Sequence, residues 1–258
     1  MLSWKTDELF VVEDTTFRIL PDHGFWGVKP RSDDERADFF VAKPRWLVER
    51  YARLIEELRP KYIFELGMFQ GGSTALLAEL ARPERLVAID RALRDKERVE
   101  EYAATRGLAG VVRTHGGVDQ ADRSKLAEIV AEDFDGQALD LVVDDCSHLY
   151  EETRASFNEL FPRLRPRGLF MIEDWPWAHT PLGTAPLEGL FPDQVPLTRL
   201  IFELVLAIPA LPGLIADVTV DLGAVTVTRG DAEVDPEGFD LSACSNPRGR
   251  ELLDTMER

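Results

Sequence analysis

Acidic residues and one histidine follow two apolar runs in the middle of the chain. Asp144, Asp145 and His148 lie in the segment Val-Val-Asp-Asp-Cys-Ser-His, and Glu173 and Asp174 end the segment Phe-Met-Ile-Glu-Asp. Carboxylates that gather in one place repel each other unless a cation lies among them. Oxygen ligands with open water positions suit Mg²⁺ or Mn²⁺. The residue types therefore predict a divalent metal site if the two segments meet.

Each of these residues also has an ordinary structural interpretation. An acidic pair at the end of a strand often forms a solvated turn or caps a helix. A single histidine is more often structural than catalytic. The functional interpretation depends on all of them lying together at one edge of a sheet.

The elements around these residues predict such an edge. From Tyr62 onward, short apolar runs alternate with longer amphipathic ones, a pattern typical of parallel strands joined by helices. The expected strands are Tyr62–Leu66, Arg85–Asp90, Val111–His115, Leu139–Asp144 and Gly168–Ile172. The expected helices are Ser73–Ala81, Asp95–Arg106, Arg123–Glu132 and Tyr150–Leu164. In such a doubly wound sheet the last two strands are neighbours, and their carboxyl ends open on one crevice.

The ends of the chain differ from this pattern. Residues Ala216–Leu222 and Ala224–Thr228 alternate apolar and polar types around a glycine, which predicts an antiparallel hairpin. The apolar stretch Leu204–Ala216 is too short to span a membrane and contains two prolines, so we expect a buried helix end and a turn. The first 60 residues hold one expected helix, Pro44–Leu58, behind an irregular lead that either caps the site or covers the sheet.

A glycine-rich turn joins the first strand to the first helix. Glu65, Gly67 and Gly71 lie in Phe-Glu-Leu-Gly-Met-Phe-Gln-Gly-Gly-Ser-Thr, which lacks the lysine of a phosphate-binding loop. Glycine lets the backbone approach a ligand closely, and the helix that follows begins with N–H groups unpaired within it. Asp90, at the end of the second strand, suits the hydroxyls of a ribose. In the alternative interpretation, Glu65 caps the helix and the glycines only form a turn.

Composition excludes several classes of protein. The 258 residues, 45% of them hydrophobic, suit one large α/β domain. The formal net charge of −17 without a basic cluster argues against a nucleic-acid partner. No membrane span is expected. Cys146 and Cys244 lack the spacing of a zinc site or a disulfide framework, and the N-terminus lacks the features of an export signal, so we expect a cytoplasmic protein.

From the glycine-rich turn, Asp90 and the terminal hairpin, the chain resembles the class I methyltransferases. Their Rossmann-like fold is a doubly wound seven-stranded sheet that ends in an antiparallel hairpin. The resemblance implies S-adenosylmethionine as the cofactor. The residues it assigns to the cofactor are Glu65, Gly67, Phe69, Gly71, Ser73, Asp90, Asp119 and Asp144.

Over residues Lys61–Asp174 the chain is similar to the metal-dependent O-methyltransferases of macrolide and rhamnose tailoring and to relatives labelled cephalosporin hydroxylases. This resemblance implies that Asp145, Glu173 and Asp174 bind Mg²⁺ or Mn²⁺ and that His148 is the general base. The sequence departs from the family where Cys146 and Arg167 replace frequent glycines. Asp144 could exchange roles with Asp145, and we place it behind the ligands.

The expected function is methyl transfer from S-adenosylmethionine to a hydroxyl of a sugar or oligosaccharide with vicinal hydroxyls. The alternatives are a catechol or other phenol as acceptor, and a non-catalytic protein that binds the cofactor. Trp175 and Trp177 suit either a sugar platform or the anchor of a lid. We expect a cap segment at 1–60, the methyltransferase domain at 61–230 and an acidic extension at 231–258. Both a monomer and a homo-oligomer remain open.

Overall fold

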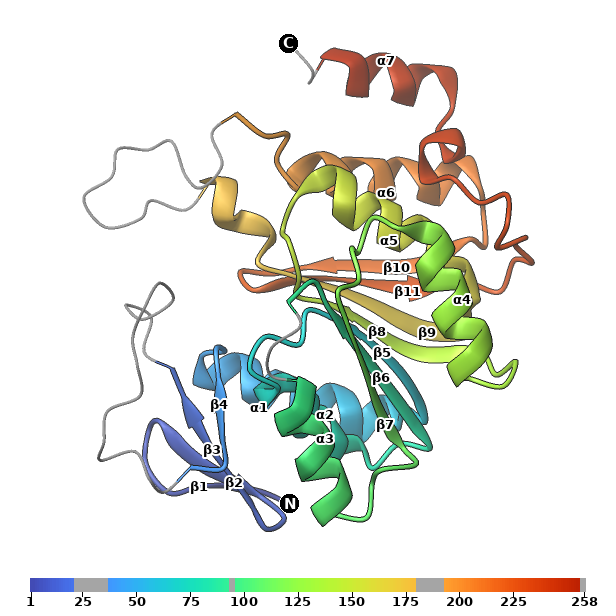
Figure 1. Ribbon diagram of the computed structural model, residues 1–258. Coiled ribbons are helices and arrows are strands. Elements are labelled where there is room, and N and C mark those ends of the chain that lie inside the picture. Colours follow the sequence, from blue (N-terminus) through green and yellow to red (C-terminus); the bar gives the residue numbers. More distant parts are fainter. Residues whose placement is uncertain (21–36, 93–95, 180–192, 256–258) are drawn as a thin grey trace. The chain divides into compact units, whose positions relative to one another are not determined.

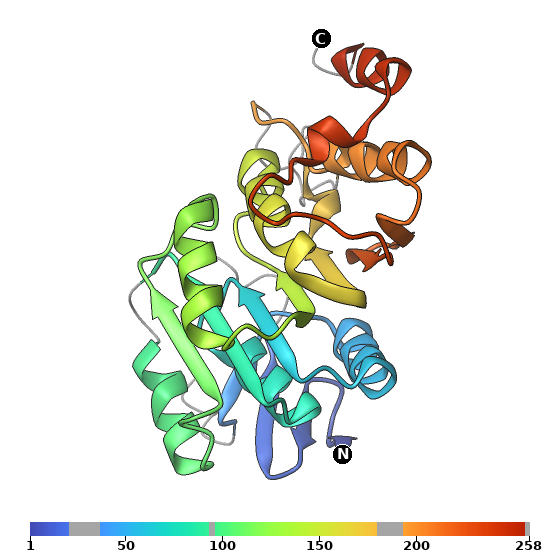
Figure 2. The same ribbon diagram turned by 90° about the vertical axis from the view of Figure 1, so that its right-hand side faces the viewer.

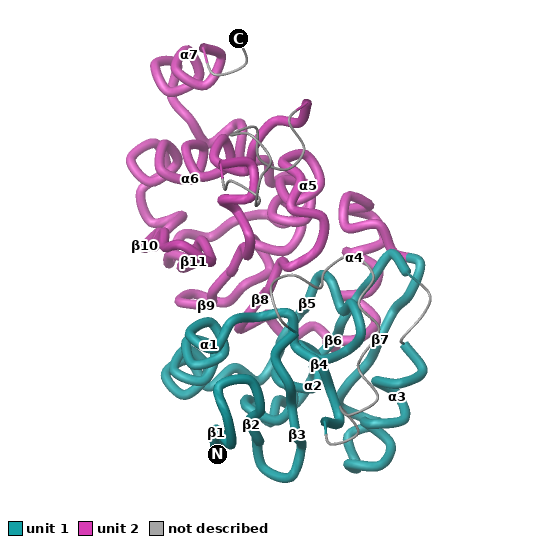
Figure 3. Tube along the Cα trace, turned by 90° about the vertical axis from the view of Figure 1, so that its left-hand side faces the viewer, with its two compact units in different colours: residues 1–117 teal, residues 118–258 magenta. Residues whose placement is uncertain are grey.

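The computed structural model describes residues 1–20, 37–92, 96–179 and 193–255 (Figure 1). Two compact units make up the chain, Met1–Gly117 and Val118–Arg258 (Figure 3). This division differs from the predicted bounds at residues 60 and 230. The N-terminal segment is part of the first unit because its aromatic side chains pack there, with the ring of Phe39 edge-on to that of Tyr102 at 5.1 Å.

Residues 2–19 and 39–41 contribute the strands of a small sheet, where an irregular lead was expected. Its strands are β1 (Leu2–Trp4), β2 (Leu9–Val12), β3 (Thr15–Ile19) and β4 (Phe39–Val41), in that order. The first three are antiparallel neighbours, and β4 runs parallel to β3. Strands of three to five residues are too short for a clear alternation of apolar and polar residues, which is why the pattern did not reveal them.

A second sheet has seven strands in the order β10-β11-β9-β8-β5-β6-β7. The bounds are β5 (Tyr62–Leu66), β6 (Arg85–Asp90), β7 (Val112–Gly116), β8 (Leu139–Asp144), β9 (Leu164–Glu173), β10 (Ile215–Val220) and β11 (Ala224–Arg229). Strands β5, β6 and β7 are parallel, as are β8 and β9. The hairpin β10–β11 pairs antiparallel with β9. The predicted doubly wound sheet with a terminal hairpin is confirmed.

The described residues form seven α-helices, of which the first five lie close to the predicted positions. They are α1 (Arg45–Leu58), α2 (Gly72–Ala81), α3 (Lys96–Thr105), α4 (Arg123–Asp133), α5 (Tyr150–Leu160), α6 (Thr198–Ala210) and α7 (Pro247–Thr255). Asp122 caps α4 by accepting a hydrogen bond from the backbone N–H of Lys125 at 3.0 Å. Helix α5 ends four residues before the predicted Leu164, because Pro162 has no N–H to continue it. Asp95, the expected start of α3, lies outside the described residues.

Helix α6 buries one charged residue and exposes several apolar ones. The expectation of a buried helix end at Leu204–Ala216 is met at Leu204 and Ala207, whereas Val205 and Ile208 are exposed. Before this stretch, Phe202 is exposed and Glu203 is buried. The segment after β11 is folded: it forms a 3₁₀ turn, η3 (Leu241–Cys244), and α7, which lies beside α6 (Figures 1 and 2). No described helix is long and apolar enough to cross a membrane.

Arg167, which stands where the family often has glycine, has an unusual backbone conformation. Its backbone φ is +65°, the left-handed region that side chains disfavour and glycine tolerates. The family's glycine therefore suits the backbone of β9 at this point. Arginine at this position carries a conformational cost of about 1–2 kcal/mol.

Candidate active site

The glycine-rich turn of the first unit has a backbone conformation and close contacts that leave no room for side chains at its glycines. Gly67 and Gly71 have φ of +92° and +82°. A Cβ atom on Gly71 would lie 2.3 Å from Cγ2 of Val99, and one on Gly72 would lie 1.8 Å from the carbonyl oxygen of Phe40. Packing within the unit therefore requires glycine at positions 71 and 72. The requirement at Gly72 was not part of the predicted motif.

Glu65 is fully buried at the end of β5 and makes a bond to the next helix. Its Oε2 accepts a hydrogen bond from Oγ1 of Thr74 at 2.5 Å. Phe69 lies in the turn with φ of +45° and is 44% exposed, and Ser73 is half-buried in the first turn of α2. The bond to Thr74 supports the structural interpretation of Glu65, and its contact with a cofactor stays a prediction.

Asp90 binds the same turn. Its Oδ2 accepts hydrogen bonds from the backbone N–H groups of Met68 at 3.1 Å and Phe69 at 2.8 Å, and its Oδ1 accepts one from Ala92 at 2.7 Å. A carboxylate has about four acceptor positions, so these bonds leave capacity for a ribose hydroxyl. Asp119, in the second unit, is exposed and accepts a hydrogen bond from the N–H of Ala121 at 2.9 Å. Asp90 therefore both shapes the turn and offers an acceptor beside it.

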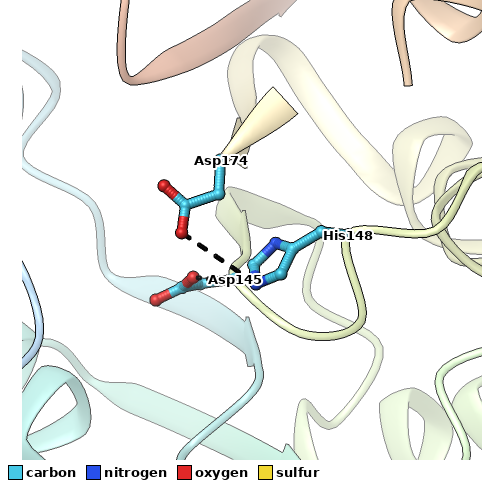
Figure 4. A group of neighbouring side chains, drawn as sticks. All are labelled: Asp145, His148 and Asp174. Atoms are coloured by element: carbon cyan, nitrogen blue, oxygen red, sulfur yellow. Dashed lines mark ion pairs between the residues drawn. The ribbon is translucent and has the colours of Figure 1, made fainter. Parts of the chain in front are cut away.

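Three of the predicted residues converge in the second unit. Ligand atoms of Asp145, His148 and Asp174 all lie within 4.8 Å of one another (Figure 4). Nε2 of His148 is 4.0 Å from Oδ1 of Asp145 and 4.0 Å from Oδ2 of Asp174, longer than a hydrogen bond. All three residues are half-buried. We call Asp145, His148 and Asp174 the acidic cluster.

The backbone of this cluster is held in an unfavourable conformation. His148 has φ of +58° and Asp174 has φ of +55°. Such conformations cost energy and concentrate at functional sites. The N–H of Asp174 donates to the carbonyl of Gly223 at 3.1 Å, so the β10–β11 hairpin supports this turn. The left-handed residues turn two side chains toward Asp145.

Asp144 takes a different role from its neighbour. It is buried, and its oxygens accept bonds from Nε2 of Gln120 at 3.0 and 2.8 Å and from Oγ of Ser156 at 2.8 Å. Burial raises the pKa of Asp144 to about 7, while these hydrogen bonds act to lower it. Oε1 of Gln120 also accepts a bond from the N–H of Ser147 at 3.0 Å. Asp144 therefore stands behind the cluster, and its exchange with Asp145 as a ligand is not supported.

The site differs from the prediction at Gln120 and Glu173. Gln120 was missed, because its only signal in the sequence is its position beside Asp119 after a strand. Glu173 is buried at the end of β9 and lies outside the acidic cluster. Its role as a metal ligand stays a prediction.

A pocket opens beside the acidic cluster. Its lining includes His148, Trp175, Trp177 and the segment 194–197. The ring centroids of His148 and Trp177 are 4.2 Å apart. Nε1 of Trp175 donates to the carbonyl of Asp221 at 2.7 Å, so this indole is attached to the hairpin. Trp175 thus serves as an anchor, whereas Trp177 contacts the histidine.

The five residues after Asp174 form a 3₁₀ turn, η2 (Trp175–His179). A ring nitrogen of His179 forms a hydrogen bond with Oγ1 of Thr198, at the start of α6. The remainder of the expected lid, from residue 180, lies outside the described residues.

The central part of the chain is similar to a known protein family. Residues 64–175 match a family described as a methyltransferase domain. The matched stretch includes both the glycine-rich turn and the acidic cluster.

Two relatives of the chain are named as O-methyltransferases. Demethylmacrocin O-methyltransferase of Streptomyces fradiae is 30% identical over 145 residues, which cover 53% of this chain and 33% of the relative. The 8-demethyl-8-alpha-L-rhamnosyl tetracenomycin-C 2'-O-methyltransferase of Streptomyces olivaceus is 36% identical over 93 residues, covering 30% of this chain and 24% of the relative.

A solved structure also resembles the chain. It is MycE methyltransferase from the mycinamycin biosynthetic pathway, in complex with Mg and SAH. It is 25% identical with a TM-score of 0.54, over 70% of this chain and 48% of that one. This chain spans about a third of the length of the Streptomyces fradiae relative and about half of MycE.

Proposed function

We propose that this protein transfers a methyl group from S-adenosylmethionine to a hydroxyl group of a sugar, using Mg²⁺ or Mn²⁺. The observation that carries the proposal is the convergence of Asp145, His148 and Asp174 from two strand ends. The carboxylates of Asp145 and Asp174 are oxygen donors that Mg²⁺ and Mn²⁺ accept, and their partial exposure leaves room for water or an acceptor. The cluster therefore fits such an ion.

Within this proposal the glycine-rich turn and Asp90 bind the cofactor, and Asp145 and Asp174 hold the metal with Glu173 as a further ligand. A divalent ion held by these residues would polarise the acceptor hydroxyl and make its proton easier to remove. The acceptor oxygen bonds to the methyl carbon, and the carbon–sulfur bond breaks with its electron pair going to sulfur. The hydroxyl proton goes to the imidazole of His148, which can accept it near neutral pH.

A sugar is favoured as the acceptor because the Streptomyces olivaceus relative is named for a rhamnosyl substrate. The pocket beside His148 supports this choice, since an indole such as that of Trp177 can pack against the C–H face of a sugar ring. The scarcity of cysteine supports a reducing environment, and we propose a cytoplasmic location.

The test is methyl transfer from labelled S-adenosylmethionine to a panel of glycosides and catechols, with chelator and with added Mg²⁺ or Mn²⁺. We expect labelled glycosides, loss of labelling in chelator, and recovery with either ion. Labelling of catechols alone would replace the sugar with a phenol. Cofactor binding without transfer to any acceptor would favour a non-catalytic protein, and full activity in chelator would refute the metal.

A further inference from the structure

A buried polar network begins two residues after His148, entirely within the second unit. The hydroxyl of Tyr150 donates to Oε1 of Glu203. Nε of Arg199 donates to the Tyr150 oxygen at 3.1 Å and to Oε1 of Glu203 at 3.4 Å. Arg154 donates to the same Tyr150 oxygen at 3.4 Å. We call Tyr150, Arg199 and Glu203 the tyrosine network.

The charged residue Glu203 of this network is buried on a helix that exposes apolar side chains. Tyr150 and Glu203 are each 3% exposed, while Phe202 and Val205 on α6 are 41% and 47% exposed. A buried carboxylate is costly to desolvate, and apolar residues in its place are often as stable or more so. Stability alone therefore does not account for placing Glu203 inside and Phe202 outside.

The location of the network suggests what it does. Tyr150 is the first residue of α5 and follows the left-handed His148 by two positions. Arg199 lies in the first turn of α6, directly after the segment 194–197 that lines the pocket beside His148. The network thus joins α5, which begins two residues after His148, to α6, which begins directly after the pocket-lining segment 194–197.

We propose that Tyr150, Arg199 and Glu203 are positioning residues that set His148 against the pocket wall at 194–197. This inference rests on the proposed function. None of the three lines the pocket, so they act through His148 and through α6. Displacement of a reacting group by about 1 Å can cost 10²-fold in rate, so loss of one bond in this network should be visible in turnover.

A similar network in the first unit provides a matched control. The hydroxyl of Tyr102 donates to Oε1 of Glu79 at 2.9 Å, and Nε of Arg106 lies 3.8 Å from the same oxygen. Tyr102 is 8% exposed. Tyr150→Phe and Tyr102→Phe therefore each remove a buried hydroxyl that donates to a glutamate, one two residues after His148 and one in the other unit.

The first experiment compares these two variants by thermal unfolding, by calorimetry with SAH, and by acceptor kinetics. We expect similar losses of thermal stability and SAH affinities within twofold of the wild type for both. Acceptor kcat/KM should fall roughly tenfold in Tyr150→Phe only. Glu203→Gln keeps an oxygen to accept the tyrosine proton and should retain more activity than Glu203→Ala. Equal kinetics for the two tyrosine variants, or no difference between the two Glu203 variants, would overturn the proposal.

A second measurement does not need turnover. The chain has four histidines, so the ring signal of His148 can be assigned in an NMR spectrum by its loss in His148→Ala. Tyr150→Phe and Glu203→Gln should shift or broaden that signal, and Tyr102→Phe should leave it in place. A wild type that methylates no acceptor but shows these shifts would refute the proposed function and retain the positioning role. An unchanged signal in Tyr150→Phe would refute the positioning role.

Discussion

The imidazole of His148 packs against the indole of Trp177, with ring centroids 4.2 Å apart and planes inclined by 50°. Both rings line the same pocket. Trp177 therefore restricts the orientation of the proposed base and also offers an apolar face to an acceptor.

Trp177→Ala should raise the acceptor's KM by about tenfold and leave the KM for S-adenosylmethionine within twofold, because a lost stacking surface weakens only the acceptor. Steady-state kinetics with each substrate varied in turn would measure both values. Trp46→Ala, which removes a 42% exposed indole from α1, serves as the control and should change neither. Equal increases in both KM values would indicate a general structural role for Trp177.

His148→Ala should lower turnover by roughly 10²–10⁴, the contribution that general-base catalysis usually makes. Turnover of the wild type should fall as the pH drops, because a protonated imidazole cannot accept the hydroxyl proton. SAH affinity, measured by calorimetry, should stay nearly unchanged. A loss in turnover below fivefold with the acid limb retained would show that His148 is not the base. Loss of Mn²⁺ affinity in this variant would instead identify His148 as a metal ligand.

Asp145→Ala and Asp174→Ala should each weaken Mn²⁺ binding at least tenfold, because each removes one carboxylate from the acidic cluster. Paramagnetic resonance of Mn²⁺ in titrations would measure the affinity. Asp217→Ala removes an exposed carboxylate from β10 and is the control. Unchanged Mn²⁺ binding in both cluster variants would place the ion elsewhere. Glu173→Ala tests the third predicted ligand by the same titration.

Asp90→Ala should weaken SAH binding at least tenfold. The substitution removes an acceptor for ribose and also the bonds to the N–H groups of Met68 and Phe69 that shape the turn. Asp119→Ala removes an exposed carboxylate and should cost only a few-fold. Calorimetry with SAH would measure both. If Asp90→Ala bound SAH with the affinity of the wild type, Asp90 would not be part of the cofactor site.

Asp144 should make the stability of the protein depend on pH. Because burial raises its pKa to about 7 from 3.8, the folded state keeps a proton that the unfolded state has already lost between these values. The contribution of this group to stability is therefore lost as the pH rises through about 7. Urea unfolding at pH 5 and pH 8 should show a smaller difference for Asp144→Asn than for the wild type. An equal or larger difference would contradict the raised pKa.

The order of the elements was predictable because it depends on local pattern. The run Leu139–Asp144 is apolar at every position except Asp140 and Asp144, and all six residues of β8 are buried. A strand that is covered on both faces requires such a run. The glycine-rich turn was recognisable for a related reason, since left-handed backbone at Gly67 and Gly71 restricts the residue type.

What the tertiary structure decided is which of the neighbouring carboxylates belong together. Asp144 and Asp145 are adjacent in the sequence, yet one binds Gln120 in the interior and the other faces His148. The backbone is left-handed at His148 and Asp174 and turns these side chains toward Asp145. Nothing in the residue types His and Asp predicts a left-handed backbone. The tyrosine network depends on α5 and α6 packing together, and residues about 50 positions apart carry no local signal of their contact. Periodicity records how a segment is buried, whereas the partner of a buried polar group is chosen only when distant segments pack.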